Sequence, residues 1–234
     1  MLTQSITPVR LLRDSLISVT PIYTSLLVFR IPRLIFSLLQ FVIPEILFTV
    51  LNYLYILSIG AVLYGAVIFF IFKKLNQEEI TISQSVQKAT EKFSEISILN
   101  ILYYLLLIIL SPRLYFALHF IIIKNYPAPD AVKRCWLLTK GYGWRVFWNF
   151  LIISLINEIL NFIPSLISAS IFGVSVWEVN SDALSATHPA FVVNKLLALA
   201  ISNFIYQPFS IVFVTLMFVR LLTVDKIKLG SSAM

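Results

Sequence analysis

The stretch that decides the fold is residues 129–148, PDAVKRCWLLTKGYGWRVFW, which lies between two long apolar stretches. It gathers basic and tryptophan side chains in one short segment: Lys133, Arg134, Trp136, Lys140, Trp144, Arg145 and Trp148. Such side chains collect at lipid headgroups, because each combines an apolar stem with a polar tip. The segment therefore predicts a chain that sits in a bilayer, with its tryptophans most simply forming an interfacial belt.

The composition around this segment is that of a membrane protein. The chain is 59% hydrophobic and 12% charged, whereas soluble domains are about 25% charged, and its mean hydropathy is +0.91. Residues 46–72 and 196–219 carry no charged side chain, and roughly 20 apolar residues are enough for a helix to cross the hydrocarbon. We therefore predict an all-α, polytopic transmembrane helical bundle that forms one integral membrane domain over residues 1–234.

The net charge of +7 does not indicate nucleic-acid binding. Lys and Arg are spread along the chain and stand at the ends of apolar runs, so anionic lipid headgroups are the simpler partner. The single cysteine, Cys135, allows no intrachain disulfide, and His119 and His188 have no Cys or His at metal-ligand spacing. We therefore expect no cofactor and no metal.

Three stretches with helical periodicity carry an apolar face opposite a charged one. They cover residues 8–20, 81–96 and 129–140, and an apolar stretch follows each. Apolar residues at three- and four-residue steps are typical of amphipathic helices at a surface. The recurrence suggests a weak internal repeat, although any membrane protein with surface helices would show the same alternation.

Four apolar stretches are long enough to span the bilayer: residues 22–43, 46–72, 144–168 and 191–222. A fifth, residues 96–123, allows two topologies because Pro112 interrupts it. It either crosses once as a tilted helix or forms a re-entrant hairpin with Pro112 near the tip.

Charge decides between these topologies. The N-terminus, the segments after Lys73 and Lys124, and the C-terminus all carry Lys or Arg, whereas residues 169–190 carry none. Cytoplasmic segments are enriched in basic residues, and the four basic segments share one side only if the chain turns back at Pro112. We therefore favour the hairpin, with the N-terminus cytoplasmic in a bacterial inner membrane or another energy-transducing membrane.

Ionisable side chains at membrane depth cost roughly 2.5–3.5 kcal/mol at a helix centre and mark candidate functional sites. The candidate intramembrane polar site consists of Arg113, Asn157, Glu158 and Asn161. We predict that Glu158 pairs with Arg113 or with Arg30. Such a pair serves either as a relay or polar substrate site, or as a buried structural contact.

Five basic residues form a candidate contact set for anionic lipid headgroups: Arg30, Arg33, Lys133, Arg134 and Arg145. Arg30 and Arg33 are three residues apart, and therefore share one helix face about two turns into the first span. They either snorkel to the headgroups or share one headgroup site with the other three.

No catalytic motif is present in the sequence. It contains no Gly-x-Ser-x-Gly, no His-Glu-x-x-His, no phosphate loop and no Gly-x-Gly-x-x-Gly. Asp130, Glu178 and Asp182 stand alone, so no pair of carboxylates at the membrane face suggests general acid–base chemistry. We expect that the chain is not an enzyme.

Two segments resemble a family of bacterial membrane proteins related to the membrane domain of glycerophosphoryl diester phosphodiesterase. The segments are Ser111–Tyr115 and Ala131–Gly141, where Cys135 replaces the serine usual in the family, and Leu11–Leu16 fits its first amphipathic helix. The resemblance implies six spans and, in some members, a catalytic barrel after this domain. The 234 residues contain no such barrel, so we do not expect phosphodiesterase activity to carry over to them. The pieces beside Pro112 are also shorter than two usual spans.

These features together predict a non-catalytic membrane protein that acts as a scaffold or accessory for a partner protein or a lipid. The alternative is a small transporter or lipid-handling protein with a polar intramembrane site around Glu158. The expected partners are anionic headgroups of the bilayer and either another membrane protein or a second copy of the chain.

Overall fold

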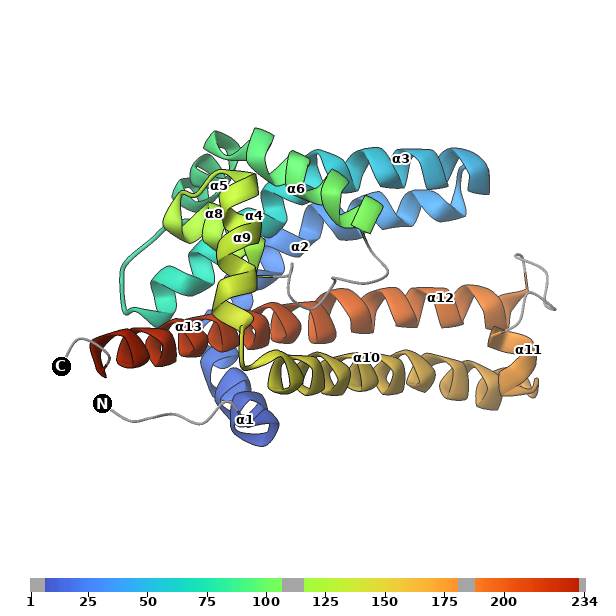
Figure 1. Ribbon diagram of the computed structural model, residues 1–234. Coiled ribbons are helices and arrows are strands. Elements are labelled where there is room, and N and C mark those ends of the chain that lie inside the picture. The colour runs from blue at the N-terminus through green and yellow to red at the C-terminus, as the bar shows by residue number, and fades with distance from the viewer. Residues whose placement is uncertain (1–6, 107–115, 181–187, 232–234) are drawn as a thin grey trace.

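The computed structural model describes residues 7–106, 116–180 and 188–231, and every regular element in these ranges is a helix (Figure 1). The predicted all-α fold is confirmed. Within these ranges, three segments are long and apolar enough to span a membrane, and the bent pair α3–α4 makes a fourth if it counts as one span. These segments, which overlap the four predicted spans, are Pro8–Phe41, Gly143–Phe172, Pro189–Val224 and the pair Glu45–Leu57 with Ile59–Leu75. The first of them also takes in the predicted amphipathic helix 8–20.

The N-terminal amphipathic helix is docked on the bundle. α1 (Pro8–Val19) packs against α13 (Gln207–Ser231), and Asp14 accepts a hydrogen bond from the buried guanidinium of Arg220. Pro21 ends this helix through a 3-10 turn, because proline has no N–H to continue the ladder.

The second predicted span is not one helix. α2 (Tyr23–Leu38) ends in a 3-10 turn, and α3 (Glu45–Leu57) and α4 (Ile59–Leu75) then meet at Ser58 with a bend of 41°. Gly60 permits this bend, because a Cβ there would lie 2.9 Å from a backbone oxygen of α3. The structure therefore differs from the single helix predicted over 46–72, since apolar composition carries no signal for a bend.

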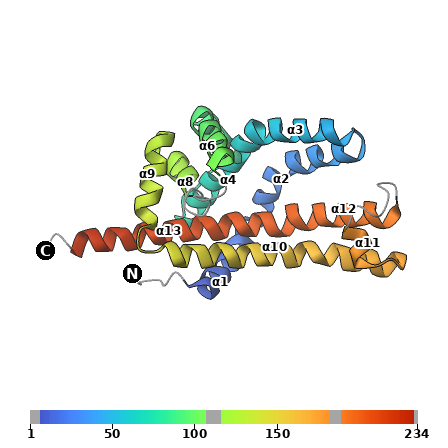
Figure 2. The same ribbon diagram turned by 45° about the vertical axis from the view of Figure 1, so that its right-hand side comes forward.

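The chain reverses direction between α6 and α8. α5 (Ile82–Glu91) ends five residues before the predicted end of its amphipathic stretch at residue 96, with Lys92 as its C-cap, and α6 (Phe93–Leu106) follows. α8 (Ala117–Lys124) then packs back against α6. α6 also stops short of the end of the molecule that α2 and α3 reach (Figures 1 and 2).

Gly65 on α4 lies where α5, α6 and α8 meet. A Cβ at Gly65 would lie 3.0 Å from the Cδ1 atoms of both Ile96 and Ile122. One continuous helix would hold these two isoleucines about 39 Å apart. The chain therefore folds back between them, as the hairpin interpretation requires, whereas the proposed tip at Pro112 lies outside the described residues.

The third amphipathic helix is α9 (Ala128–Thr139), close to the predicted 129–140. Glu95 caps its N-terminus, because Oε2 accepts the Ala128 N–H at 2.6 Å. Gly141, with φ +83°, supplies the left-handed turn into α10 (Gly143–Phe172). α10 then runs to the short helix α11 (Val176–Asn180) at the far end of the molecule.

The last span contains a π-helical segment. α12 (Pro189–Ile201) continues through η3 (Ser202–Tyr206) into α13. Pro208 accounts for the irregularity, because it has no N–H for the carbonyl of Phe204. The hydroxyl of Tyr23 on α2 donates to that carbonyl at 2.5 Å, which ties the π segment to the first span.

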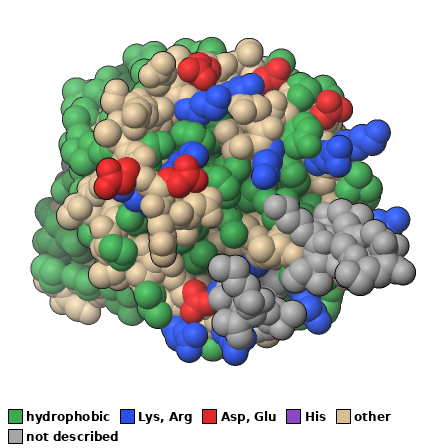
Figure 3. Space-filling view, turned by 90° about the vertical axis from the view of Figure 1, so that its left-hand side faces the viewer, with side chains coloured by type: hydrophobic (Ala, Val, Ile, Leu, Met, Phe, Trp, Pro, Cys, Tyr) green, Lys and Arg blue, Asp and Glu red, His purple; other side chains and the backbone are tan. Residues whose placement is uncertain are grey.

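α1, α5, α9 and the C-terminal part of α13 lie at one end of the molecule, opposite α11 and the α2–α3 turn (Figures 1 and 2). Figure 3 looks onto that end and shows charged side chains spread over it, with apolar side chains along one flank. We call it the charged end. The basic segments therefore lie together, which is the arrangement that the hairpin interpretation requires.

Candidate functional site

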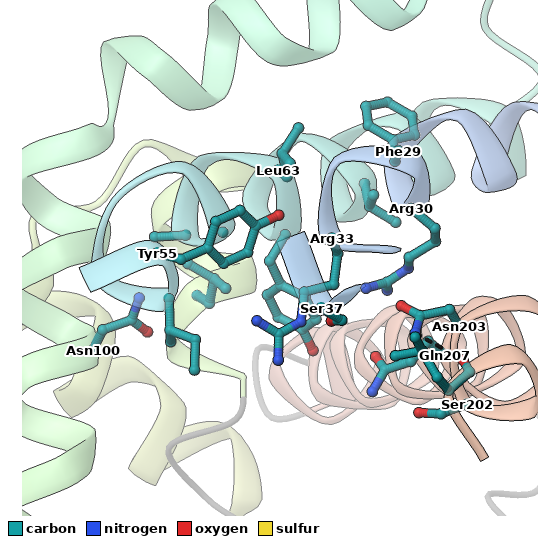
Figure 4. Close-up of a pocket in the computed structure, with 17 residues that line it drawn as sticks. Phe29, Arg30, Arg33, Ser37, Tyr55, Leu63, Asn100, Ser202, Asn203 and Gln207 are labelled. Atoms are coloured by element: carbon teal, nitrogen blue, oxygen red, sulfur yellow. Dashed lines mark hydrogen bonds between the residues drawn. The ribbon is translucent and has the colours of Figure 1, made fainter. Parts of the chain in front are cut away.

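A partly open cavity with a mixed polar and apolar lining lies between α2, the α3–α4 bend and η3 (Figure 4). Its volume is about 350 Å³, within the range of small-molecule sites. We call it the arginine cavity. Its polar lining residues are Arg30, Arg33, Ser37, Tyr55, Tyr64, Asn100, Ser202, Asn203 and Gln207.

Arg33 is held in place by two contacts from α3. Its Nη1 donates to Oδ1 of Asn52 at 2.6 Å, and its Cζ lies 5.3 Å from the centre of the Tyr55 ring. An aromatic face attracts a guanidinium through its quadrupole. The Tyr55 ring is itself fixed by stacking on Phe36, with the centroids 4.5 Å apart. Arg33 is therefore oriented before any ligand arrives.

Arg30 is less satisfied than Arg33. Its Nη2 is buried and has no hydrogen-bond partner among the described residues. The guanidinium points toward Asn203 and Gln207 on the other wall of the cavity (Figure 4). A buried, unpaired charged group is costly, so this atom is the natural contact for an incoming acceptor.

The opposite wall is polar but uncharged. Ser202 and Asn203 come from the π segment, Gln207 from the first turn of α13, and Asn100 from α6. No Asp or Glu is found among the described residues that line the cavity. The hydroxyl of Tyr55 is buried and makes no hydrogen bond within the described part of the chain. The cavity therefore offers two positive charges and several hydrogen-bonding groups to a ligand.

The structure divides the predicted set of anionic-lipid contacts in two. Arg30 and Arg33 line the arginine cavity. Lys133, Arg134 and Arg145 are exposed at or near the charged end, and none of them lines that cavity. The single headgroup site shared by all five residues is therefore not assembled.

The predicted polar site around Glu158 is also not assembled in the described residues. Glu158 is exposed on α10, and Asn157 and Asn161 beside it are half-buried. Within the described ranges no ion pair joins Glu158 to Arg30. Arg113, the other predicted partner, lies outside those ranges. No group of three potential metal ligands occurs in the described part of the chain.

Sequence reasoning missed the polar wall and the α3 contacts. Asn203 and Gln207 are four residues apart in the uncharged run 196–219, and Asn52 and Tyr55 are three apart in another such run. Polar side chains at helical spacing inside an apolar span often face other helices. That spacing was the available signal, but it is fainter than a charge.

The fold and the cavity together define a polytopic helical membrane domain with a cationic interior site. The chain belongs to the family described as the membrane domain of glycerophosphoryl diester phosphodiesterase, whose pattern matches residues 90–232. The resemblance drawn from the sequence is therefore confirmed. No curated protein and no solved structure matches the chain.

Proposed function

We propose that this chain is a non-catalytic membrane accessory module that binds the anionic headgroup of a lipid in the arginine cavity. The observation that carries the proposal is the convergence of Arg30 and Arg33 on a cavity whose described lining contains no acid. The unpartnered Nη2 of Arg30 supports it further. A phosphate or carboxylate would satisfy both guanidinium groups at once.

The chemistry of the cavity favours binding over catalysis. Hydrolysis needs a nucleophile beside a general base, or a metal to activate water. The lining hydroxyls belong to Ser37, Ser202, Tyr55 and Tyr64, and no histidine or carboxylate is found among the described lining residues to activate them. The proposal therefore keeps the expectation that the module holds its ligand unchanged.

The proposed orientation follows from the charged end. Basic residues concentrate there, and the far end carries Glu45 and Glu178. Cytoplasmic segments of membrane proteins are enriched in Lys and Arg. We therefore assign the charged end, with both chain termini, to the cytoplasmic side of a bacterial inner membrane.

The test measures lipid retention by the purified protein in mild detergent with native mass spectrometry. Phosphatidylglycerol and phosphatidylcholine are added separately, and the protein is expected to retain the anionic lipid preferentially, with unchanged lipid mass. Arg30→Gln with Arg33→Gln should remove the anionic lipid held in the arginine cavity, so the variant should retain fewer phosphatidylglycerol molecules per protein than the native chain. Lys195→Gln removes an exposed cation of α12 outside the cavity and serves as the matched control. Full retention by the double-arginine variant would overturn the proposal.

A second candidate role is a scaffold for another membrane chain or for a second copy of this one. It rests on Glu158, which is exposed midway along the 30 residues of α10. A carboxylate facing hydrocarbon is unfavourable, so a covering helix would stabilise it. Because Glu158 does not line the arginine cavity, we do not adopt the transporter role centred on it. If the native protein and the Glu158→Gln variant have the same oligomeric state, that result would count against this scaffold role.

A further inference from the structure

A second cationic cavity lies at the charged end, between α8, α9 and α13. Its volume is about 390 Å³, and it shares no lining residue with the arginine cavity. We call it the Lys124–Arg134 groove. Its lining residues are Phe72, Phe120, Lys124, Tyr126, Arg134, Leu137, Leu138, Val219, Leu222 and Thr223.

The end of α8 builds the cationic rim. Asn125 adopts φ 57°, the left-handed conformation of a helix C-cap, and the Tyr126 N–H donates to the Phe120 carbonyl at 3.3 Å. This turn fixes the Tyr126 ring, over which the Cζ of Arg134 lies at 5.4 Å from the centroid. Lys124, the last residue of α8, lines the same groove. Local structure therefore holds Arg134 over Tyr126, at the groove that Lys124 also lines.

Beneath the rim, the groove is apolar. Phe72, Phe120 and Leu138 form its inner side with Val219 and Leu222 of α13. Neither Asp nor Glu occurs among its described lining residues, and Thr223 adds a hydroxyl at the rim. A cationic rim over an apolar floor complements a molecule with a negative head and a hydrocarbon tail.

Exposed apolar and aromatic side chains lie on α9, which lines the groove, and at the start of α10, the next helix in the chain. Trp136 and Leu137 of α9 are 47% and 52% exposed. Trp144 and Phe147 at the start of α10 are also exposed and stack with their centroids 5.4 Å apart. Tryptophan concentrates at the level of lipid headgroups. The groove therefore opens where the phosphates of the surrounding leaflet are found.

We propose that the Lys124–Arg134 groove binds an anionic phospholipid of the surrounding leaflet. Its phosphate contacts Lys124 and Arg134, and the first part of an acyl chain lies over Phe120 and Leu138. The ligand is a bilayer lipid and not free phosphate, because the apolar floor would stay unfilled by an ion. The groove holds this lipid independently of the arginine cavity, so lipid binding at one site can be disproved without affecting the proposal for the other site.

The test uses quenching of the fluorescence of a tryptophan placed at Leu137, a residue that lines the groove and is 52% exposed, by brominated lipids. The reporter is a variant that carries Leu137→Trp and replaces the native tryptophans with Phe, reconstituted in mixed micelles. Brominated phosphatidylglycerol is titrated against brominated phosphatidylcholine. The anionic lipid should quench the fluorescence at a lower mole fraction than the neutral lipid. Lys124→Gln with Arg134→Gln should reduce this preference for the anionic lipid by roughly fivefold for each charge removed. Equal quenching by the two lipids in the reporter protein overturns the proposal.

Matched variants separate the groove from general surface charge. Lys133→Gln removes the neighbouring cation of α9, which is exposed but does not line the groove, and should leave the preference intact. Arg134→Lys keeps the charge but weakens the aromatic contact, so it should retain part of the preference. An equal loss in Lys133→Gln, or displacement of the lipid by millimolar inorganic phosphate, would contradict the proposal. Arg30→Gln with Arg33→Gln should leave this signal unchanged.

Discussion

Asp14 forms two ion pairs, one with a buried arginine and one with an exposed arginine. This difference in burial yields a quantitative prediction. One partner is Arg220, whose side chain is 6% exposed; the other is Arg13, whose side chain is 69% exposed. Breaking a fully buried pair costs about 3–5 kcal/mol, and exposed pairs contribute about 0–1 kcal/mol. Because the Asp14 side chain is 26% exposed, we expect Asp14→Asn to weaken docking of α1 by about 2 kcal/mol.

Hydrogen–deuterium exchange of α1 measures this docking directly. A loss of about 2 kcal/mol corresponds to roughly a 30-fold increase in the opening equilibrium, and therefore in the exchange of α1 amides. Arg13→Gln is the control and should change exchange by less than about fivefold. Asp14→Leu combined with Arg220→Met removes both charges and should restore most of the protection. Equal exchange in Asp14→Asn and Arg13→Gln would refute the distinction between buried and exposed pairs.

Three other perturbations have defined outcomes. Gly65→Leu overfills the junction of three helices and should lower the free energy of unfolding by about 1–3 kcal/mol in an SDS titration, whereas unchanged stability would show that the junction is loose. Tyr23→Phe withdraws a donor from the Phe204 carbonyl and should cost about 1–3 kcal/mol in the same titration; no cost would mean that another group supplies the donor. Hydrogen bonds from the backbone N–H and the hydroxyl of Ser175 lower the pKa of Glu178 below its usual value. The stability they give is therefore present above the unfolded-state pKa and lost as the pH falls through the folded-state pKa. In Ser175→Ala, a carboxyl ¹³C NMR titration should find this pKa raised, and an unmoved midpoint would contradict the assignment.

The helices were predictable because their signals are local. Apolar periodicity located the amphipathic helices, and the long uncharged runs located the spans. The bend at Ser58 was not predictable in this way, because Gly60 contributes only the absence of a side chain beside α3. The end of α5 at Glu91 was not predictable either, because no Gly or Pro stands there to break the helix. Only the packing of Ala89 against Gly65 distinguishes this part of the helix.

The candidate site was predictable only in part. Arg30 and Arg33 stood out because charges inside an apolar stretch are rare. Asn203 of the π segment and Gln207 of α13 line the same cavity but lie more than 160 positions later in the chain. Sequence spacing carries no information about residues brought together over such a distance. Glu158 stood out for the same reason as the arginines, yet α10 turns it outward. A charged residue inside an apolar stretch can therefore be found from the sequence, but the sequence does not tell whether its side chain faces a cavity or the outside of the bundle.

The residues that line the arginine cavity come from two parts of the chain, and only one of these parts matches the family. Its amide wall, Asn100, Asn203 and Gln207, lies within residues 90–232, the part that matches the family. Its cations, Arg30 and Arg33, lie before that part. Family membership by itself therefore does not entail a positive cavity. A relative could keep the whole matched region and still prefer a neutral ligand, so ligand charge would be set by the first span and ligand position by the last.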